Sequence, residues 1–361
     1  MKINVAMARS NSSPFTIEEV ELDEPRYDEV IVKIAGVGLC HTDLAMKEAF
    51  PVFPLVLGHE GSGVVEKVGS QVTRVKPGDK VTISYRSCGK CRQCLEGVPY
   101  YCANFSQYNS TGTRPDGSFT IKNDDGPVFA NFLGQSSFGT YSLTNESQIV
   151  KVPDDIPLEL LGPLGCGIQT GAGAVINSLG VRAGSSIAIF GTGSVGLSAV
   201  MAAAVSGCTK IIAVDVNDER LKKSQELGAT HVVNSKKHNP VSVIHDICGG
   251  AGSDFALDTS ANPGVMRQAL ESVYKNGTCG WLGVYSGDIA IDYISILNGR
   301  KIVGIMAGSS ICDVFIPSLI ELYQAGKLPF DKFIRKYKLS DINEAVADSH
   351  SGSTIKAVLI P

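Results

Sequence analysis

The 361-residue sequence lacks an excess of positive charge, an apolar leader and an uninterrupted apolar run of membrane length. Its 32 Lys and Arg residues against 36 Asp and Glu residues give a net charge of −4, which disfavours binding to nucleic-acid phosphates. The first residues, MKINVAMARSNSSPF, contain no apolar core of signal-peptide length. The longest apolar stretch, 185–208, is interrupted by four glycines and predicts a strand, a turn and a helix. We therefore expect a cytoplasmic protein with no nucleic-acid partner and no membrane association.

The chain does contain ten cysteines, which in a reducing compartment serve as metal ligands or as buried side chains. Four of them are separated by two, two and seven residues, namely Cys88, Cys91, Cys94 and Cys102. Such short gaps let one loop wrap several thiolates around a tetrahedral ion, which suits zinc. An iron–sulfur motif has a shorter last gap followed by proline, and a disulfide cluster needs an oxidising compartment. The spacing therefore favours a structural zinc lobe.

Length and local pattern together predict two domains. From about residue 4 to residue 153, frequent glycine and proline and short alternating apolar runs are typical of a β-rich domain. From about residue 185, apolar strands alternate with helical segments. This alternation predicts a parallel sheet with helices on both faces.

A glycine-rich turn in the second domain has the context of a dinucleotide site. Gly191, Gly193 and Gly196 follow an apolar strand and open a helix, where they allow a tight turn, a close pyrophosphate and close helix packing. Asp215 ends the next strand, 19 residues after Gly196. A carboxylate there accepts ribose hydroxyls and repels a 2′-phosphate, which favours NAD over NADP. The alternative role for Asp215 is a helix N-cap.

Two more segments, 40–43 and 58–60, contain residue types that bind metals, and a further thiol lies at Cys166. Cys40, His59 and Cys166 would give two thiolates, one imidazole and an open fourth position, as in catalytic zinc sites. Spacing alone does not bring these three residues together. A lone buried cysteine is more often a small core residue, so this alternative remains for Cys166.

These motifs resemble the zinc-containing medium-chain alcohol dehydrogenases over essentially the whole chain. The matching segments are GLCHTD, GHEGSGVVEKVG, the four-cysteine lobe, GCGIQTGAG, GTGSVG with Asp215, and TIKAVL. The resemblance implies an α/β protein with a Rossmann-type doubly wound parallel sheet at 168–306. It also implies a β-rich GroES-like catalytic domain with a zinc lobe at 1–167 and 307–361. Within the family, GQSSFGTYS and LGCGIQTGAGAVIN are most similar to the aryl-alcohol (benzyl alcohol) dehydrogenases.

The resemblance further implies two zinc ions per chain and assigns the catalytic one to Cys40, His59 and Cys166, with Glu60 as an occasional partner. Asp43 would hold the second ring nitrogen of His59, which fixes its tautomer. The residues implied to contact NAD are Thr170 and Val195 at the nicotinamide, Arg220 at the adenosine ribose, and His41 and Lys356 at the pyrophosphate.

Two positions depart from the best-known members of the family. A histidine five residues after the first zinc cysteine usually ends the proton relay, and here that residue is Ala45. The relay is then implied to run from Thr42, which takes the alcohol proton, to solvent or to His41. A bulky aromatic often faces the substrate four residues before the lobe, and here Ser84 leaves room that Tyr85 could refill.

The function implied is zinc-dependent oxidation of a primary aromatic alcohol to its aldehyde with NAD, by a homodimer or homotetramer acting on a small molecule. Two alternatives stay open. One is the same fold acting on another alcohol, such as a formaldehyde–thiol adduct, a polyol or an aliphatic alcohol, because a fold does not fix a substrate. The other is a non-catalytic zinc-binding module, which the acidic composition and the glycine turn disfavour.

Overall fold

The computed structural model describes residues 1–361 and separates into two compact units. The first comprises Met1–Cys166, Ile311–Pro317 and Asp331–Pro361, and the second comprises Gly167–Ser310 and Ser318–Phe330. The sequence predicts that the whole of 307–361 belongs to the first domain. Part of that stretch clusters with the second unit, because helix α10 (Cys312–Gln324) changes unit at its internal Pro317.

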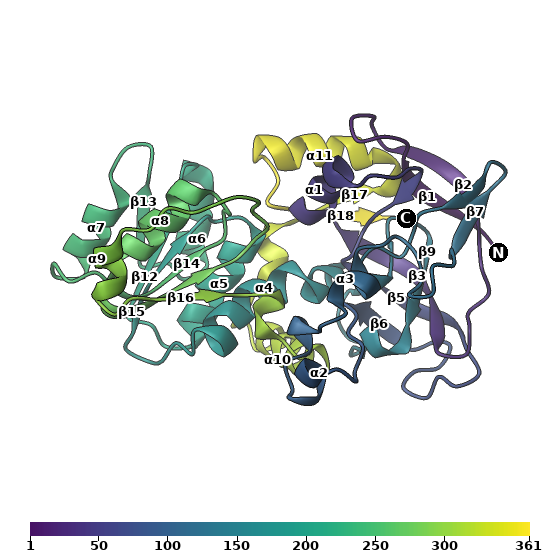
Figure 1. Cartoon of the computed structure of the whole chain (residues 1–361), viewed down its shortest axis with the longest axis horizontal. Helices are drawn as coiled ribbons and strands as arrows, with labels where there is room; N and C mark the ends of the chain where they lie inside the picture. The colour runs from purple at the N-terminus through teal and green to yellow at the C-terminus, as the bar shows by residue number, and fades with distance from the viewer. The chain divides into compact units, whose positions relative to one another are not determined.

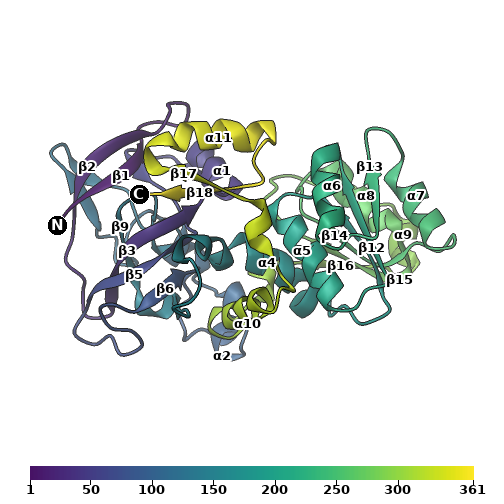
Figure 2. The same ribbon diagram turned by 180° about the vertical axis from the view of Figure 1, so that it is seen from behind.

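Two sheets build the first unit, as Figures 1 and 2 show from opposite sides. The smaller has the order β4-β1-β2-β7-β8, with bounds Leu55–Val56, Lys2–Ala8, Thr16–Leu22, Ile121–Asn123 and Gly126–Val128. The larger has the order β10-β6-β5-β3-β18-β17, with β9 also paired to β3. Its bounds are Ile149–Lys151, Lys80–Ile83, Gly61–Val68, Glu29–Gly38, Lys356–Ile360, Ile334–Lys338 and, for β9, Tyr141–Asn145.

Strand β3 lies at the centre of the larger sheet because its sequence, EVIVKIAGVG, is apolar on both faces and mostly buried. Its end pairs antiparallel with the C-terminal strand β18, with Val358 opposite Gly38. Leu39 N also donates to Ala357 O at 2.9 Å. This register brings Lys356 to the level of Cys40, although the two residues lie at opposite ends of the chain.

The helices of the first unit are short, and α1 matters most for the site. Their bounds are His41–Ala49 for α1, Arg92–Leu95 for α2, Phe105–Asn109 for α3 and Ile342–Ser351 for α11. Helix α1 begins directly after Cys40, whose backbone N donates to Asp43 Oδ2 at 3.0 Å. An acidic side chain in the first turn accepts a hydrogen bond from a free N–H group, and its negative charge interacts favourably with the positive end of the helix dipole.

The second unit is a six-stranded parallel sheet in the order β13-β12-β11-β14-β15-β16. The strand bounds in that order are His231–Asn234, Lys210–Asp215, Ser186–Phe190, Ser253–Asp258, Val273–Trp281 and Lys301–Gly304. The strand order reverses between β11 and β14, and dinucleotides bind at such switch points in open α/β sheets. The turn after β11 begins at Gly191, so the predicted glycine turn lies at this point.

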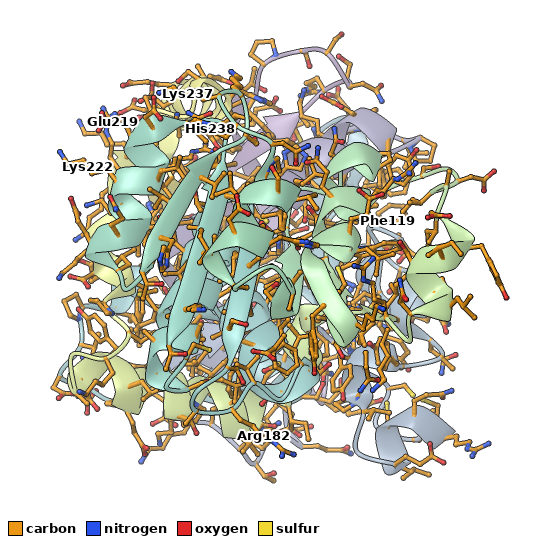
Figure 3. All side chains as sticks on the ribbon, turned by 90° about the vertical axis from the view of Figure 1, so that its left-hand side faces the viewer. Phe119, Arg182, Glu219, Lys222, Lys237 and His238 are labelled. Atoms are coloured by element: carbon orange, nitrogen blue, oxygen red, sulfur yellow. The ribbon has the colours of Figure 1, made fainter.

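The helices of the second unit alternate with its strands. Their bounds are Gly167–Gly173 for α4, Ser194–Val205 for α5, Asp218–Glu226 for α6, Pro240–Ile247 for α7, Pro263–Ser272 for α8 and Tyr293–Leu297 for α9. Glu219 and Lys222 of α6 project outward in Figure 3, while Leu221 is buried against the sheet. Three of these helices start after an asparagine whose side chain caps the first turn, namely Asn217, Asn239 and Asn262. No helix in either unit is both long enough and apolar enough to cross a bilayer.

Candidate metal and dinucleotide sites

Four side chains from three distant segments meet inside the first unit. Cys40, His59, Glu60 and Cys166 place their ligand atoms within 4.8 Å of one another. His59 is only 2% exposed and Glu60 is fully buried. Thiolate, imidazole and carboxylate are the protein groups that bind zinc, so the donor set suits that ion.

Glycines allow these segments to approach one another. Cys40 follows β3, while His59 and Glu60 lead into β5. A Cβ atom on Gly38 would lie 1.9 Å from Glu60 Oε2, and one on Gly162 would lie 2.1 Å from Glu60 O. Only a residue without a side chain permits such approaches, so both glycines are structural requirements of the cluster.

The ring of His59 is held so that one nitrogen faces the cluster. Its Nδ1 lies 2.8 Å from Asp43 Oδ1. The same carboxylate accepts hydrogen bonds from Cys40 N and Gly58 N, each at 3.0 Å. His59 Nε2 is buried and has no hydrogen-bond partner, which is costly for a polar atom. A free Nε2 beside two thiols, with Nδ1 held by a carboxylate, is the arrangement that a zinc ligand requires.

The two thiols of the cluster interact directly. A hydrogen bond with Cys166 lowers the pKa of Cys40 well below its usual value, burial acts against this, and His59 adds to the lowering. The same hydrogen bond, together with burial, raises the pKa of Cys166. Thiolates are the ligands of zinc, so zinc binding at this pair would release thiol protons.

Glu60 is paired with a buried cation. Lys356 Nζ donates to Glu60 Oε2 at 2.9 Å, to Glu60 Oε1 at 3.0 Å and to Leu39 O at 3.1 Å. Burial raises the pKa of Glu60 to about 7, and the charge of Lys356 opposes this rise. Burial is the largest single influence on Lys356 and favours its neutral amine, but the charge of Glu60, the nearby thiols and the hydrogen bond to Glu60 together raise the pKa of Lys356. All three ammonium donors of Lys356 are used within the first unit, so the predicted pyrophosphate contact would require Lys356 to give up one of these bonds.

The four-cysteine lobe is a second cluster, with the sulfurs of Cys88, Cys91, Cys94 and Cys102 within 4.8 Å of one another. Cys91 Sγ lies 3.5 Å from Cys94 Sγ and 3.9 Å from Cys102 Sγ. Four thiolates around one ion, with bonds of about 2.3 Å, would be about 3.8 Å apart. Burial opposes ionisation of Cys88, but the backbone N–H of Lys90 and other donors lower its pKa to about 6, whereas burial raises the pKa of Cys94 to about 12, so the spacing of the sulfurs is what points to an ion. The lobe therefore also fits zinc.

The first turn of α1 presents the residues predicted to move the alcohol proton. His41 is exposed and Thr42 is partly exposed. Ala45, one turn further on, offers no titratable group. The accessible hydroxyl and imidazole on this turn are therefore the groups of α1 that can pass a proton to solvent.

The glycine turn of the second unit fits a dinucleotide. Gly191 has φ +88°, and a Cβ on Gly196 would lie 1.8 Å from Gly191 O, so both positions require glycine. A Cβ on Gly193 would meet no atom within 4 Å. The space over Gly193 lies at the N-terminus of α5, where free N–H groups bind phosphate.

Asp215 is already bonded to the protein. Its Oδ2 accepts from Thr192 N at 2.7 Å and Thr192 Oγ1 at 2.8 Å, and its Oδ1 accepts from Val216 N at 2.7 Å and Asn217 N at 3.0 Å. These contacts fill the roughly four acceptor positions of a carboxylate. A ribose hydroxyl would have to replace one of these donors, and the Thr192 hydroxyl is the one side-chain group among them. The alternative N-cap role is excluded, because Asn217 caps α6.

The remaining predicted cofactor residues also lie in the second unit. Arg220, on α6, has a buried Nε with no hydrogen-bond partner. Thr170 lies on α4 and Val195 on α5, and these helices touch, since a Cβ on Gly171 would lie 2.0 Å from Val195 O. Thr170 and Val195 therefore lie on two helices that pack closely against each other.

Two polar residues that the sequence analysis left unassigned contact these sites. Thr192 bonds to Asp215, and the amide of Gln135 bonds to the backbone of His59 and Gly61. Thr192 lies inside the glycine turn, and Gln135 lies in a segment that served only to identify the subfamily. The position of Thr192 and Gln135 inside these two sequence motifs was the signal that could have identified them.

Comparison with known proteins identifies both units. The family described as "Zinc-binding dehydrogenase" matches residues 194–325, and "Alcohol dehydrogenase GroES-like domain" matches residues 26–154. A geraniol dehydrogenase from Castellaniella defragrans is 42% identical over 360 residues, which cover 98% of this chain and 96% of that protein.

Solved structures are similar over the full length. An alcohol dehydrogenase zinc-binding domain protein from Burkholderia ambifaria is 46% identical, with a TM-score of 0.97. A benzyl alcohol dehydrogenase from Acinetobacter calcoaceticus is 42% identical, with a TM-score of 0.96. Each comparison covers 100% of this chain and 99% of the other.

Proposed function

Because this chain belongs to the zinc-type medium-chain alcohol dehydrogenase family, with an NAD(P)-binding Rossmann domain, we propose that it oxidises primary aromatic alcohols to aldehydes with NAD. The observation that carries the substrate class is the full-length similarity to a benzyl alcohol dehydrogenase. Geraniol, named in another relative, is likewise a primary alcohol with an unsaturated carbon beside the carbinol carbon. A primary allylic alcohol is therefore the second candidate substrate.

Small side chains beside Cys166 support a ring-sized substrate. Ser84 Oγ donates to Gly165 O at 2.6 Å, directly before Cys166, and Cys312 Sγ donates to Ser84 Oγ at 3.2 Å. A serine folded onto a carbonyl takes less room than the bulky aromatic expected at this position in relatives. The neighbouring Tyr85 ring packs on Phe105, with 6.0 Å between ring centroids.

The chain's own residues bind and orient the reactants. Bound zinc would polarise the alcohol oxygen as a Lewis acid, and NAD would accept the hydride. Cys40, His59 and Cys166 would hold the zinc, with the His59 tautomer fixed by Asp43. Thr42 accepts the alcohol proton and passes it to solvent or His41.

Asp215 supports NAD as the cofactor. Asp215 is 8% exposed at the end of β12, where the negative charge of its carboxylate repels a 2′-phosphate. Asp215→Ser should reduce the preference for NAD over NADP by about 2 kcal/mol, because it removes the repulsion and a ribose acceptor together. Steady-state kinetics with both cofactors checks this. A wild-type preference for NADP would overturn the role of Asp215.

The substrate proposal is tested by steady-state kinetics at one pH on benzyl alcohol, geraniol, ethanol, a polyol and a formaldehyde–glutathione adduct. Burying a phenyl group is worth about 2–3 kcal/mol, so kcat/KM for benzyl alcohol should exceed that for ethanol at least tenfold, mostly through KM. A preference for geraniol would favour the allylic candidate. Similar values for benzyl alcohol and ethanol, or a preference for the polyol or the adduct, would contradict the proposal.

A further inference from the structure

Residues 131–138, here named the clamp segment, run along the chain that carries His59. Ser137 N donates to Gly58 O at 2.9 Å, and Phe138 N donates to Leu57 O at 3.0 Å. Ser136 Oγ donates to Val56 O at 2.6 Å. The clamp segment contains the GQSS motif, for which the catalytic scheme has no role.

Within the clamp segment, the side chain of Gln135 reaches the metal-binding backbone. Its Nε2 donates to His59 O at 2.9 Å and, at a longer 3.4 Å, to Ser84 O. Its Oε1 accepts from Gly61 N at 3.1 Å and from Ser137 Oγ at 3.0 Å. Gln135 is 2% exposed, so these four contacts use all of its hydrogen-bonding capacity inside the protein.

The contacts also fix the orientation of the Gln135 amide. Nε2 faces two carbonyl oxygens, and Oε1 faces one N–H and one hydroxyl. A flipped amide would place oxygen against the carbonyls of His59 and Ser84 and nitrogen against the N–H of Gly61. The observed orientation is therefore the one that satisfies every partner.

Through Ser84, the amide joins two parts of the buried metal cluster. Gln135 holds the peptide groups on both sides of Glu60, directly after His59. Ser84 Oγ donates to Gly165 O, directly before Cys166. Gln135 and Ser84 together thus connect the segment that carries the imidazole to the segment that carries the thiol of Cys166.

The backbone around Gln135 has an uncommon conformation. Asn131, Leu133 and Ser136 have φ values of 101°, 47° and 46°, a region that residues with side chains seldom occupy. Ser136 Oγ stabilises the turn by accepting from Asn131 N at 2.7 Å and Phe132 N at 2.8 Å. Strained backbone held by specific contacts is concentrated at functional sites.

We propose that Gln135 is a positioning residue for the catalytic zinc. Its amide fixes the backbone at residues 59–61 against Ser84 and thereby sets the position at which His59 meets Cys166. The proposal depends on the proposed function in one respect, namely that zinc occupies the buried cluster.

The test compares two variants, Gln135→Met and Gln148→Met, in the full-length zinc-loaded protein. Gln148 is a matched control because it is also a buried glutamine, 1% exposed, that donates to Ser84 O at 2.9 Å. Its other partners are Leu133 O, in the clamp segment, and Thr144 Oγ1, so it shares Ser84 and the clamp segment with Gln135 and differs in making no hydrogen bond to residues 59–61. Methionine matches the length of glutamine and removes only the polar contacts.

The readouts are the rate at which a chelator removes each zinc ion, the melting temperature, and the visible spectrum after Co²⁺ replaces zinc in the buried cluster. In Gln135→Met, one of the two zinc ions should leave about 10–100-fold faster than in the wild type, and the cobalt bands should shift. In Gln148→Met, the melting temperature should fall while metal release and the cobalt bands stay unchanged. Equal metal release in the two variants would overturn the proposal.

A milder variant covers the case in which Gln135→Met does not fold. Ser137→Ala removes only the hydroxyl that donates to Gln135 Oε1, and it should speed release of one zinc ion a few-fold. Release at the wild-type rate in this variant would overturn the proposal. A wild-type protein that binds one zinc ion instead indicates failure of the proposed function, whereas an unexpected substrate leaves the metal-release result untouched.

Discussion

In the four-cysteine lobe, all candidate ligands come from residues 88–102, whereas the buried cluster draws its candidate ligands from residues 40, 59–60 and 166. Backbone N–H groups of the lobe itself donate to its sulfurs, since Cys91 N donates to Cys88 Sγ and Cys88 N donates to Cys102 Sγ, each at 3.3 Å. In the buried cluster, two charged side chains from outside the cluster instead hold its members: Asp43 holds His59, and Lys356 holds Glu60.

The lobe therefore has the features of a structural metal site, and the buried cluster has the features of a catalytic one. Four thiolates complete a tetrahedral zinc site and leave no position for a substrate. The buried cluster offers two thiols and the unpartnered Nε2 of His59, with a partly exposed hydroxyl at Thr42 nearby in sequence. We therefore expect loss of the first site to affect stability and loss of the second to affect turnover.

The largest expected effect follows removal of a thiol ligand from the buried cluster. Cys166→Ala should lower kcat/KM at least about 10³-fold, because Lewis-acid stabilisation of the transition state is worth several kcal/mol. Steady-state kinetics and circular dichroism check the loss and the retained fold. Cys279→Ala is the control, since this buried cysteine lies outside both metal clusters. Full activity in Cys166→Ala would remove the distinction between the sites.

In the lobe, Cys94→Ser should instead destabilise the fold. Structural zinc contributes directly to folding, and loss of a bound metal can cost about 4 kcal/mol. Denaturant unfolding measures this loss, and kcat/KM per folded molecule should stay near the wild-type value. A stable but inactive Cys94→Ser protein would contradict the assignment.

Thr42 further distinguishes the two sites, because the four-cysteine lobe has no residue with a predicted role in proton transfer. Thr42→Ala should lower kcat about 10²-fold through loss of general acid–base help, while Thr42→Ser keeps the hydroxyl and should be nearly silent. Rates measured under saturating alcohol and cofactor test this pair. If Thr42→Ala turned over normally, the proton would leave by another route.

The smallest effect in this series concerns the carboxylate behind His59. Asp43→Asn keeps the size of the side chain but places an amide where Cys40 N, Gly58 N and His59 Nδ1 require acceptors. Activity or affinity for the buried metal should fall about 10–100-fold. Chelator titration measures the affinity, with the exposed Asp116→Asn as a control. An unchanged affinity would show that Asp43 does not set the ligand geometry.

The same comparison explains what the sequence alone could predict. The predicted α/β fold, with a GroES-like and a Rossmann-type domain, is confirmed. The lobe and the glycine turn could be predicted from the sequence because their residues are close together in the chain and the spacing between them reflects local geometry. The buried cluster was predicted only through a family resemblance, since no spacing rule joins residues 40, 59 and 166.

Other contacts depend on tertiary register and on the reach of side chains. Lys356 meets Glu60 because β18 pairs with β3 in one particular register, and this register cannot be predicted from the sequence alone. Gln135 and Thr192 act through single side-chain hydrogen bonds whose partners lie 76 and 23 residues away. Composition and periodicity describe faces and elements, and they cannot identify such pairs.

Zinc content measured by elemental analysis, together with activity, tests the central claim most directly. The wild type should contain two zinc ions per chain, and Cys166→Ala and Cys94→Ser should each contain one. Activity should be lost only in Cys166→Ala, and stability should be lost mainly in Cys94→Ser. One zinc ion per chain in the wild type, or the same loss of activity and stability in both variants, would contradict the account.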